Sequence, residues 1–317
     1  MKRFLAAFAV AAVTAAHAQG YPDRPLHFVV PFTAGSGTDI VARTLGEALS
    51  KSLGQPILVE NRPGAGGTVG AGLVARAAGD GYTFLVHSAG HVANPAIYTN
   101  LPYDTVKDFA CVTPLASLPN VLIAAPSKGF KDAKDLVQRA RAQPGALNYG
   151  SAGTGSATHM NAELFRLVAG FDAVHVPFRG TPEALTETAT GRLDFFFAPL
   201  ASALPFIQDG GVKALAVGTP KRSPLLPDVP TTAEAGFRGS EYTFWVAMLA
   251  PAGTPRPIVD RMNAELVKIL ATPEMKQRLA ALGAEPMPMA PAAFDAFLRD
   301  ETARMQDVVK NAKIPVQ

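Results

Sequence analysis

The chain has 317 residues, 48% of them hydrophobic, and a formal net charge of +3. The length suggests two domains of ordinary size, and the composition is sufficient for a large core. A single cysteine, Cys111, excludes an intrachain disulfide bond and a thiolate metal cluster, and no run of Lys and Arg with interleaved aromatic residues indicates nucleic-acid binding.

The N-terminus has the three parts of a secretory signal: a basic start, an apolar run over residues 4–16 and the small-x-small site Ala16-His17-Ala18. The run is too short to span a bilayer, which takes roughly 20 residues, and no cysteine at the site offers a lipid anchor. A buried N-terminal helix is the alternative, but a strand follows almost at once. We therefore predict that residues 1–18 are a signal peptide, cleaved after Ala18 on export to a bacterial periplasm. Loss of Lys2 and Arg3 lowers the net charge from +3 to +1.

The first part of the mature chain alternates short apolar runs with segments of helical spacing. This alternation predicts an α/β fold with a mostly parallel sheet. The predicted strands span residues 26–32, 57–60 and 82–86, and the predicted helices span residues 40–49 and the Ala-rich stretch from the Gly-rich loop 63–67 to about residue 78.

A second cycle of the same kind begins at residue 121 and predicts a second lobe. Its predicted strands span residues 121–125, 147–150, 172–177, 195–198 and 214–217, and its predicted helices span residues 133–142 and 157–168. A further strand is predicted at residues 244–249, and the C-terminal part is predicted to be helical at residues 258–270, 273–282 and 292–311. We assign residues 19–123 and 244–317 to a discontinuous lobe 1 and residues 124–243 to lobe 2. The chain would then cross between the lobes near Leu122 and near Trp245.

Two small-residue loops lead directly into predicted helices. The first loop is Ala34-Gly35-Ser36-Gly37-Thr38-Asp39, and the second loop is Ser151-Ala152-Gly153-Thr154-Gly155-Ser156. Glycines let backbone N–H groups approach a ligand, and a helix N-terminus has unpaired donors and the positive end of a dipole. Each loop alone is equally an ordinary N-cap turn. Because ligands bind at the carboxyl ends of strands in open α/β sheets, two such loops across a cleft predict a site for a carboxylate or another small anion.

Four side chains near these loops are further candidates, each with an open alternative. His159 follows the second loop by one helical turn and either donates to a bound anion or packs against the helix. Phe32 and Phe197 either form the floor of a pocket or belong to the core. Arg179 is the one nearby cation that lobe 2 offers to a ligand, and otherwise it forms a surface ion pair.

The sequence contains no set of residues that is typical of a catalytic site. The letters Gly-x-Ser-x-Gly do not occur, and no His-x-x-x-His pair has a nearby carboxylate. The acidic residues Asp39, Asp104, Glu183 and Asp194 show no spacing that would pair two of them on one helix face. His87 and His91 flank Ser88 in a turn after the third strand, where histidines are usually just solvated. We therefore predict no catalytic residue, no bound metal, no cofactor and no enzymatic activity.

Several longer motifs occur together in order along the chain. They are residues 30–35 (VPFTAG), 60–67 (ENRPGAGG), 80–83 (DGYT), 149–153 (YGSAG) with His159, 176–180 (VPFRG), 230–236 (PTTAEAG) and 249–255 (LAPAGTP). They cover essentially all of the mature chain, which closely resembles the Bug family, the extracytoplasmic solute receptors of tripartite tricarboxylate transporters.

The resemblance implies a type II periplasmic-binding-protein fold that closes like a clamp around a small carboxylate, held by the two loops partly through ordered water. It also implies delivery to a membrane permease with a large and a small subunit. Ser36 departs from the glycine of many relatives, and residues 87–91 vary in the family, so that segment receives no role from it. The candidate ligand-binding residues are Phe32, Ala34, Gly35, Ser36, Gly37, Thr38, Asp39, Ser88, Ser151, Ala152, Gly153, Thr154, Gly155, Ser156, His159, Arg179 and Phe197.

Two other functions stay open: a sensor that presents its closed form to a membrane kinase, and a secreted hydrolase or isomerase on a two-lobed α/β fold. The missing catalytic constellation disfavours the enzyme. The family binds amino acids, di- and tricarboxylates, nicotinate and aromatic acids, so the resemblance does not name the ligand. Because the first loop offers amide donors without an obligatory cation, we predict a monocarboxylate, an amino acid or a dicarboxylate in preference to citrate. We expect a monomer with no nucleic-acid partner.

Overall fold

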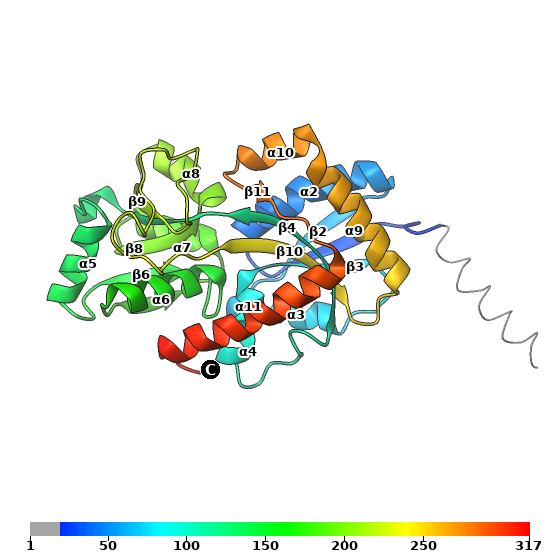
Figure 1. Ribbon diagram of the computed structural model, residues 1–317, viewed down its shortest axis with the longest axis horizontal. Coiled ribbons are helices and arrows are strands. Elements are labelled where there is room, and N and C mark those ends of the chain that lie inside the picture. The colour runs from blue at the N-terminus through cyan, green and yellow to red at the C-terminus, as the bar shows by residue number, and fades with distance from the viewer. Residues whose placement is uncertain (1–19) are drawn as a thin grey trace, which may run out of the picture.

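The computed structural model describes residues 20–317, which form two α/β lobes side by side (Figure 1). The predicted signal peptide and its cleavage after Ala18 lie outside the described residues. Within the part of the chain that is described, no helix is long and apolar enough to cross a membrane.

The first lobe is built on a six-stranded sheet with the order β11-β4-β10-β3-β1-β2. Its strands are β1 (Leu26–Val30), β2 (Ile57–Asn61), β3 (Thr83–Ser88), β4 (Phe109–Leu118), β10 (Phe244–Pro251) and β11 (Glu285–Pro286). Its helices are α2 (Gly37–Leu53), α3 (Thr68–Ala75), α4 (Asn94–Ile97), α9 (Arg256–Ala271), α10 (Pro273–Ala280) and α11 (Pro291–Asn311), with the 3₁₀ turns η1 (Ala65–Gly67) and η2 (Ala89–Val92). Helices α2 and α9 cover one face of the sheet, and α3 and α11 cover the other (Figure 1).

The second lobe is built on a five-stranded sheet with the order β7-β6-β8-β5-β9. Its strands are β5 (Asn120–Ala124), β6 (Asn148–Ser151), β7 (Val174–Pro177), β8 (Phe195–Pro199) and β9 (Lys213–Val217). Its helices are α5 (Ala133–Ala142), α6 (Ala157–Ala169), α7 (Thr181–Ala189) and α8 (Leu200–Gln208), with the 3₁₀ turn η3 (Pro126–Lys128).

The two-residue period of β8 explains how this second sheet is covered on both faces. Phe195 and Phe197 point into the cluster formed with α5 and α6, whereas Phe196 and Ala198 point into the cluster formed with α7 and α8. All four side chains are fully buried. A strand that is apolar on both sides therefore sits between two helical layers, as expected in an α/β lobe.

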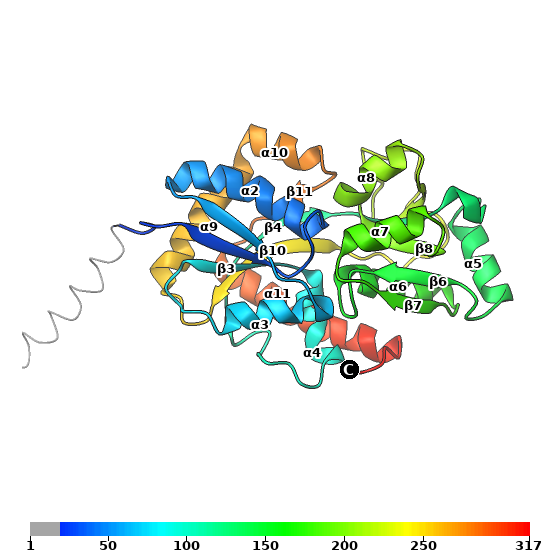
Figure 2. The same ribbon diagram turned by 180° about the vertical axis from the view of Figure 1, so that it is seen from behind.

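The sheets are mixed, whereas the sequence analysis expected mostly parallel sheets. Parallel pairs join β1 to β2 and β3, and β6 to β7 and β8. Antiparallel pairs involve β10 in the first lobe and β5 in the second. Strand β4 leads out of the first sheet into β5 and β10 leads back into the first sheet, so β4 and β10 run in opposite directions as neighbours. The strands β4 and β10 extend towards the second lobe in both views (Figure 1, Figure 2).

The crossing between the sheets begins earlier than the sequence analysis placed it. Strand β5 starts at Asn120 and pairs only within the second sheet, although residues 120–123 were assigned to lobe 1. Five helices and strands were not predicted: β4, α4, α7, α8 and β11. Strand β4 is buried along nearly all of its length and so shows no alternation, and α8 contains Pro205 in its interior, which argues against a helix.

Candidate ligand-binding cleft

The first loop is held by a cap at the start of α2. Ser36 has extended backbone angles (φ −68°, ψ 156°), and its hydroxyl accepts the N–H of Asp39 at 3.3 Å. The carboxylate of Asp39 in turn accepts the N–H of Gly35 at 2.9 Å, and it is paired with Arg43 at 3.0 Å. Gly35 has φ +80°, which favours glycine at this turn. The sequence pattern Ser-x-x-Asp therefore forms a reciprocal cap of the kind that satisfies two backbone donors at once.

The second loop repeats this arrangement at the start of α6. Ser156 has nearly the same angles (φ −63°, ψ 158°), and its hydroxyl accepts the N–H of His159 at 3.3 Å. Gly155 also has φ +80°, and its N–H donates to Nδ1 of His159 at 3.2 Å. The two loops are thus matched residue by residue, with His159 in the place that Asp39 occupies in the first lobe.

Both helix N-termini face one cavity between the lobes. The N–H groups of Gly37 and Thr38 in α2, and of Ala157 and Thr158 in α6, precede the first intrahelical hydrogen bond of each helix. All four residues line an inner cavity, together with Phe32, Ser36, Ser88, Ala152, Ser156, Thr181, Pro199 and Phe244. The cavity measures about 10 Å³, which is about the space that one water molecule needs. The lobes are therefore closed on each other.

Two hydrogen bonds and several glycines join the lobes around this cavity. The hydroxyl of Tyr98 donates to the carbonyl of Thr154 at 2.9 Å, and the hydroxyl of Ser202 donates to the carbonyl of Gly35 at 3.0 Å. Each loop thus accepts one hydrogen bond from the opposite lobe. At Gly66, a Cβ atom would lie 1.9 Å from the carbonyl oxygen of Thr154, so the backbones touch where no larger residue fits.

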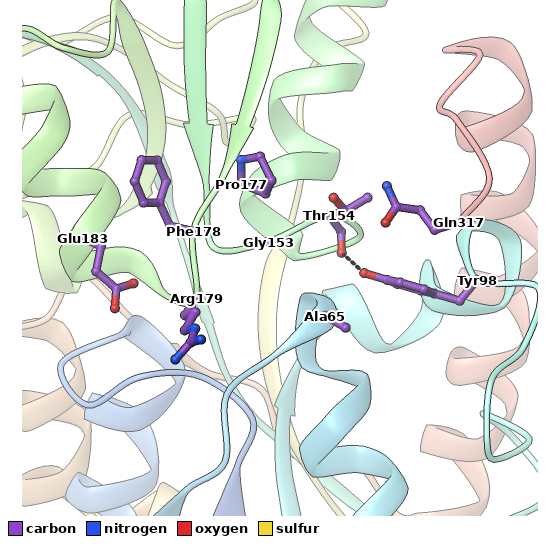
Figure 3. Close-up of a pocket in the computed structure, with 9 residues that line it drawn as sticks. All are labelled: Ala65, Tyr98, Gly153, Thr154, Pro177, Phe178, Arg179, Glu183 and Gln317. Carbon is purple, nitrogen blue, oxygen red and sulfur yellow. Dashed lines mark hydrogen bonds between the residues drawn. The ribbon is translucent and has the colours of Figure 1, made fainter.

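A second, open groove of about 500 Å³ lies at the outer mouth between the lobes (Figure 3). Its side chains include the exposed Arg179 and Glu183 of lobe 2 and Tyr98 of lobe 1. Figure 3 shows the Arg179 side chain directed from the loop after β7 towards the first lobe. The inner cavity therefore has backbone donors and hydroxyls, and the outer groove has the charged side chains.

The predicted site residues fall into three groups. Lining the inner cavity are Phe32, Ser36, Gly37, Thr38, Ser88, Ala152 and Ser156. Lining the outer groove are Gly153, Thr154 and Arg179. The remaining predicted residues line neither the inner cavity nor the outer groove: Ala34, Gly35, Asp39, Ser151, Gly155, His159 and Phe197. Phe197 belongs to the core of the second lobe, because the alternation of β8 turns it towards α6.

The structure adds residues that the sequence analysis did not single out. Thr181, Pro199 and Phe244 line the inner cavity, and Tyr98 and Gly66 close it from the first lobe. The Gly-rich loop 63–67 was not among the predicted ligand-binding residues. The sequence did contain a signal for this role: the loop directly follows the predicted strand at residues 57–60. The first loop also follows a predicted strand, so both loops lie at the same edge of the sheet.

His87 and His91 are buried core side chains rather than solvated ones. Nδ1 of His87 accepts the N–H of Ser88 at 2.7 Å, and its ring packs edge-on against Phe32 at 5.5 Å. Burial lowers the pKa of His91 to about 4 and holds the pKa of His87 well below its usual range. Both rings are therefore neutral at pH 7. Among residues 20–317, no three His, Cys, Asp or Glu side chains gather as a metal site would require.

Comparison with known proteins identifies the family. The model of the tripartite tricarboxylate transporter family receptor matches residues 41–314. BugT of Bordetella pertussis is 32% identical over 317 residues, which cover 98% of this chain and 97% of that protein. The structure of Rpa4515 of R. palustris with adipate has a TM-score of 0.90 at 35% identity, covering 94% of this chain and 100% of that one. The structure of MatC from Rhodopseudomonas palustris with bound malate has a TM-score of 0.86 at 37% identity, covering 91% and 100%. The chain belongs to the tripartite tricarboxylate transporter receptors of the Bug type, a family of periplasmic solute-binding proteins and not of enzymes.

Proposed function

We propose that this protein captures a small organic acid between its lobes and delivers it to a tripartite permease. The observation that carries the proposal is the convergence of two capped helix N-termini, one from each lobe, on the inner cavity. Backbone N–H groups at helix N-termini bind carboxylates well because the donors are preformed and the helix dipole favours negative charge. The family relationship supports both delivery to a permease and a periplasmic location, and the predicted signal peptide agrees with that location.

Capture requires the lobes to separate first. A cavity of about 10 Å³ admits no organic acid, so the ligand enters an open form and is enclosed on closure. In this proposal the ligand replaces part of the direct contact between the loops. The Tyr98 and Ser202 hydrogen bonds and the close approach at Gly66 then stabilise the closed form around it.

The lining of the cleft favours acids with one or two carboxylates over citrate. The inner cavity is lined by amides, hydroxyls and the apolar Phe32, Phe244 and Pro199, and by no lysine or arginine among the described residues. An amide cradle suits one carboxylate but supplies no full positive charge for two more. The relatives with adipate and with malate bind dicarboxylates. A dicarboxylate here would place its second group towards Arg179 in the outer groove.

A thermal-shift screen followed by calorimetry tests the proposal on the mature protein. The panel comprises benzoate, nicotinate, glutamate, succinate, malate, adipate and citrate. A ligand at 100 times its Kd stabilises the folded state by about 2.7 kcal/mol, which is readily detected. We expect at least one mono- or dicarboxylate to bind more tightly than citrate. Tight binding of citrate alone, or of no acid in the panel, would contradict the proposed ligand class.

A further inference from the structure

Two histidines of lobe 2 are hydrogen-bonded to opposite ends of the second loop. Nδ1 of His159 accepts the N–H of Gly155 at 3.2 Å, at the end of the loop. At its start, the hydroxyl of Ser151 lies 2.6 Å from Nε2 of His175. The same hydroxyl oxygen accepts the N–H of Gly153 at 3.0 Å, which leaves its own proton free to be donated to His175.

The two imidazoles form one rigid support behind the loop. Their rings stack with centroids 4.0 Å apart, and both stack on Tyr149 of β6. His159 is 2% exposed. Burial lowers the pKa of each ring to about 3, so both are neutral at pH 7 and each has one nitrogen free to accept a hydrogen bond.

The neighbours of each ring fix its tautomer. Nε2 of His159 faces the carboxylate of Glu163 at 4.0 Å, so its proton belongs on Nε2 and Nδ1 is the acceptor. For His175 we assign the hydroxyl of Ser151 as the donor, so that Nε2 is the acceptor and the ring proton is on Nδ1. The rings therefore carry opposite tautomers, and each presents its unprotonated nitrogen to the second loop.

The first lobe achieves the same fixation with a different side chain. There Asp39 accepts the N–H of Gly35 and is itself held by Arg43 and by the amide of Asn61 at 2.8 Å. A side-chain acceptor at the third helical position is thus common to both loops. The equivalence predicts that an uncharged acceptor of the same reach can replace the imidazole of His159.

We propose that His159 and His175 are positioning residues: as hydrogen-bond acceptors they hold the second loop in the conformation that binds the ligand's carboxylate. They do not touch the ligand. This inference rests on the proposed function, because it assigns a role in that same site. It differs from the role of direct donor considered for His159 from the sequence, since both ring nitrogens of His159 face groups of its own lobe.

The tautomers are tested without any ligand. Long-range ¹H–¹⁵N NMR of ¹⁵N-histidine-labelled protein at pH 7 distinguishes the two ring nitrogens, with signals assigned through single variants. We expect His159 to be protonated only on Nε2 and His175 only on Nδ1. A proton on Nδ1 of His159 or on Nε2 of His175, or a doubly protonated ring, would overturn the inference.

Paired variants then test the effect on binding, with adipate as the probe in calorimetry. His159→Phe keeps an aromatic stack but removes the acceptor, and it should weaken adipate binding about tenfold. His159→Asn places an oxygen near the position of Nδ1 and should recover most of that loss. His175→Phe and His175→Gln form the second pair, and His27→Phe on the far strand β1 is the control.

The outcomes distinguish the positioning role of the two histidines from the proposed ligand class. Equal affinities for the Phe and Asn variants at position 159, and for the Phe and Gln variants at position 175, would overturn the positioning role. Failure of the wild-type protein to bind adipate counts against the proposed ligand, whereas the ring tautomers still decide whether the loop is held as described. If a Phe variant does not fold, the other pair and the tautomers of the wild-type protein keep the test decisive.

Discussion

The hydroxyl of Tyr98 in the first lobe donates a 2.9 Å hydrogen bond to the carbonyl of Thr154 in the second loop, across the mouth of the closed cleft. Tyr98→Phe removes this bond alone and should weaken ligand binding about two- to tenfold, because a single hydrogen bond contributes about 0.5–1.5 kcal/mol. Calorimetry measures the affinity, and small-angle scattering measures the degree of closure. Tyr82→Phe, whose hydroxyl bonds Asp23 at the surface, is the control. Equal affinities for the two variants would show that the Tyr98 bond does not stabilise the closed form.

A methyl group at position 66 should keep the lobes apart. The Cβ atom of Gly66→Ala would lie 1.9 Å from the carbonyl oxygen of Thr154, which cannot yield without moving the second loop. We expect loss of ligand binding and a larger radius of gyration in small-angle scattering. Gly54→Ala is a matched control, because Gly54 has a similar φ (+67° against +61°) and nothing within 4 Å of the added methyl.

The control separates closure from backbone strain. Both substitutions place alanine in the left-handed region and should cost about 1 kcal/mol of stability. Only the substitution at Gly66 should abolish binding. If Gly66→Ala binds as tightly as Gly54→Ala, the direct contact between the loops is not part of the ligand-bound form.

Removing the hydroxyl of Ser156 should affect both stability and binding. The hydroxyl caps α6, and loss of such a cap costs about 1 kcal/mol. Because Ser156 also lines the inner cavity, Ser156→Ala should weaken binding roughly ten- to a hundredfold, the range for a hydrogen bond to a charged group. Asp132→Ala removes the cap of α5, which is remote from the cleft, and should cost stability without weakening binding. Unchanged affinity in Ser156→Ala would reduce the second loop to a structural role.

Stability should rise with pH between about 5 and 6.5. Burial lowers the pKa of His91 to about 4 and of His159 and His175 to about 3, whereas an unfolded histidine titrates near 6.5. The unfolded chain therefore binds more protons in this window, and each buried histidine adds up to about 1.4 kcal/mol to the free energy of unfolding per pH unit. This contribution is fully present above pH 6.5 and is lost progressively as the pH falls from 6.5 to the folded-state pKa.

Urea denaturation at half-unit pH steps measures the slope. Carboxylates titrate mainly below pH 5, so the window isolates the histidines. His91→Phe should reduce the slope of the unfolding free energy against pH by up to about 1.4 kcal/mol per pH unit, which corresponds to one proton. A free energy of unfolding that is flat from pH 5 to 6.5 would contradict the neutral, buried state of these rings.

The sequence was sufficient for the parts of this fold that depend on local pattern. The helix predicted at residues 133–142 has those bounds in the structure, and the helix predicted from residue 157 begins there, capped by Ser156. The helix predicted at residues 40–49 begins earlier, at Gly37, and its cap is Ser36. Contacts between residues far apart in the chain could not be predicted from local sequence patterns. The stacking of His159 on His175 and the approach of Gly66 to Thr154 depend on how strands and lobes are placed in space. Strand β4 was not predicted because it is buried on both faces, so apolar and polar residues do not alternate along it.

The last prediction concerns Arg179, which lines the outer groove with its side chain exposed. Adipate and hexanoate have the same six carbons but differ in the distal carboxylate, so their comparison isolates the charge that Arg179 would meet. Arg179→Gln should weaken adipate binding about two- to fivefold, since an exposed ion pair contributes at most about 1 kcal/mol, and should leave hexanoate binding unchanged. Arg192→Gln, an exposed cation of the same lobe paired with Glu187, is the control. The loss for adipate should shrink as salt rises, because the pair is solvent-exposed. Equal losses for both acids would mean that Arg179 acts on closure rather than on the second carboxylate, and no loss for either would make it a solvated surface residue.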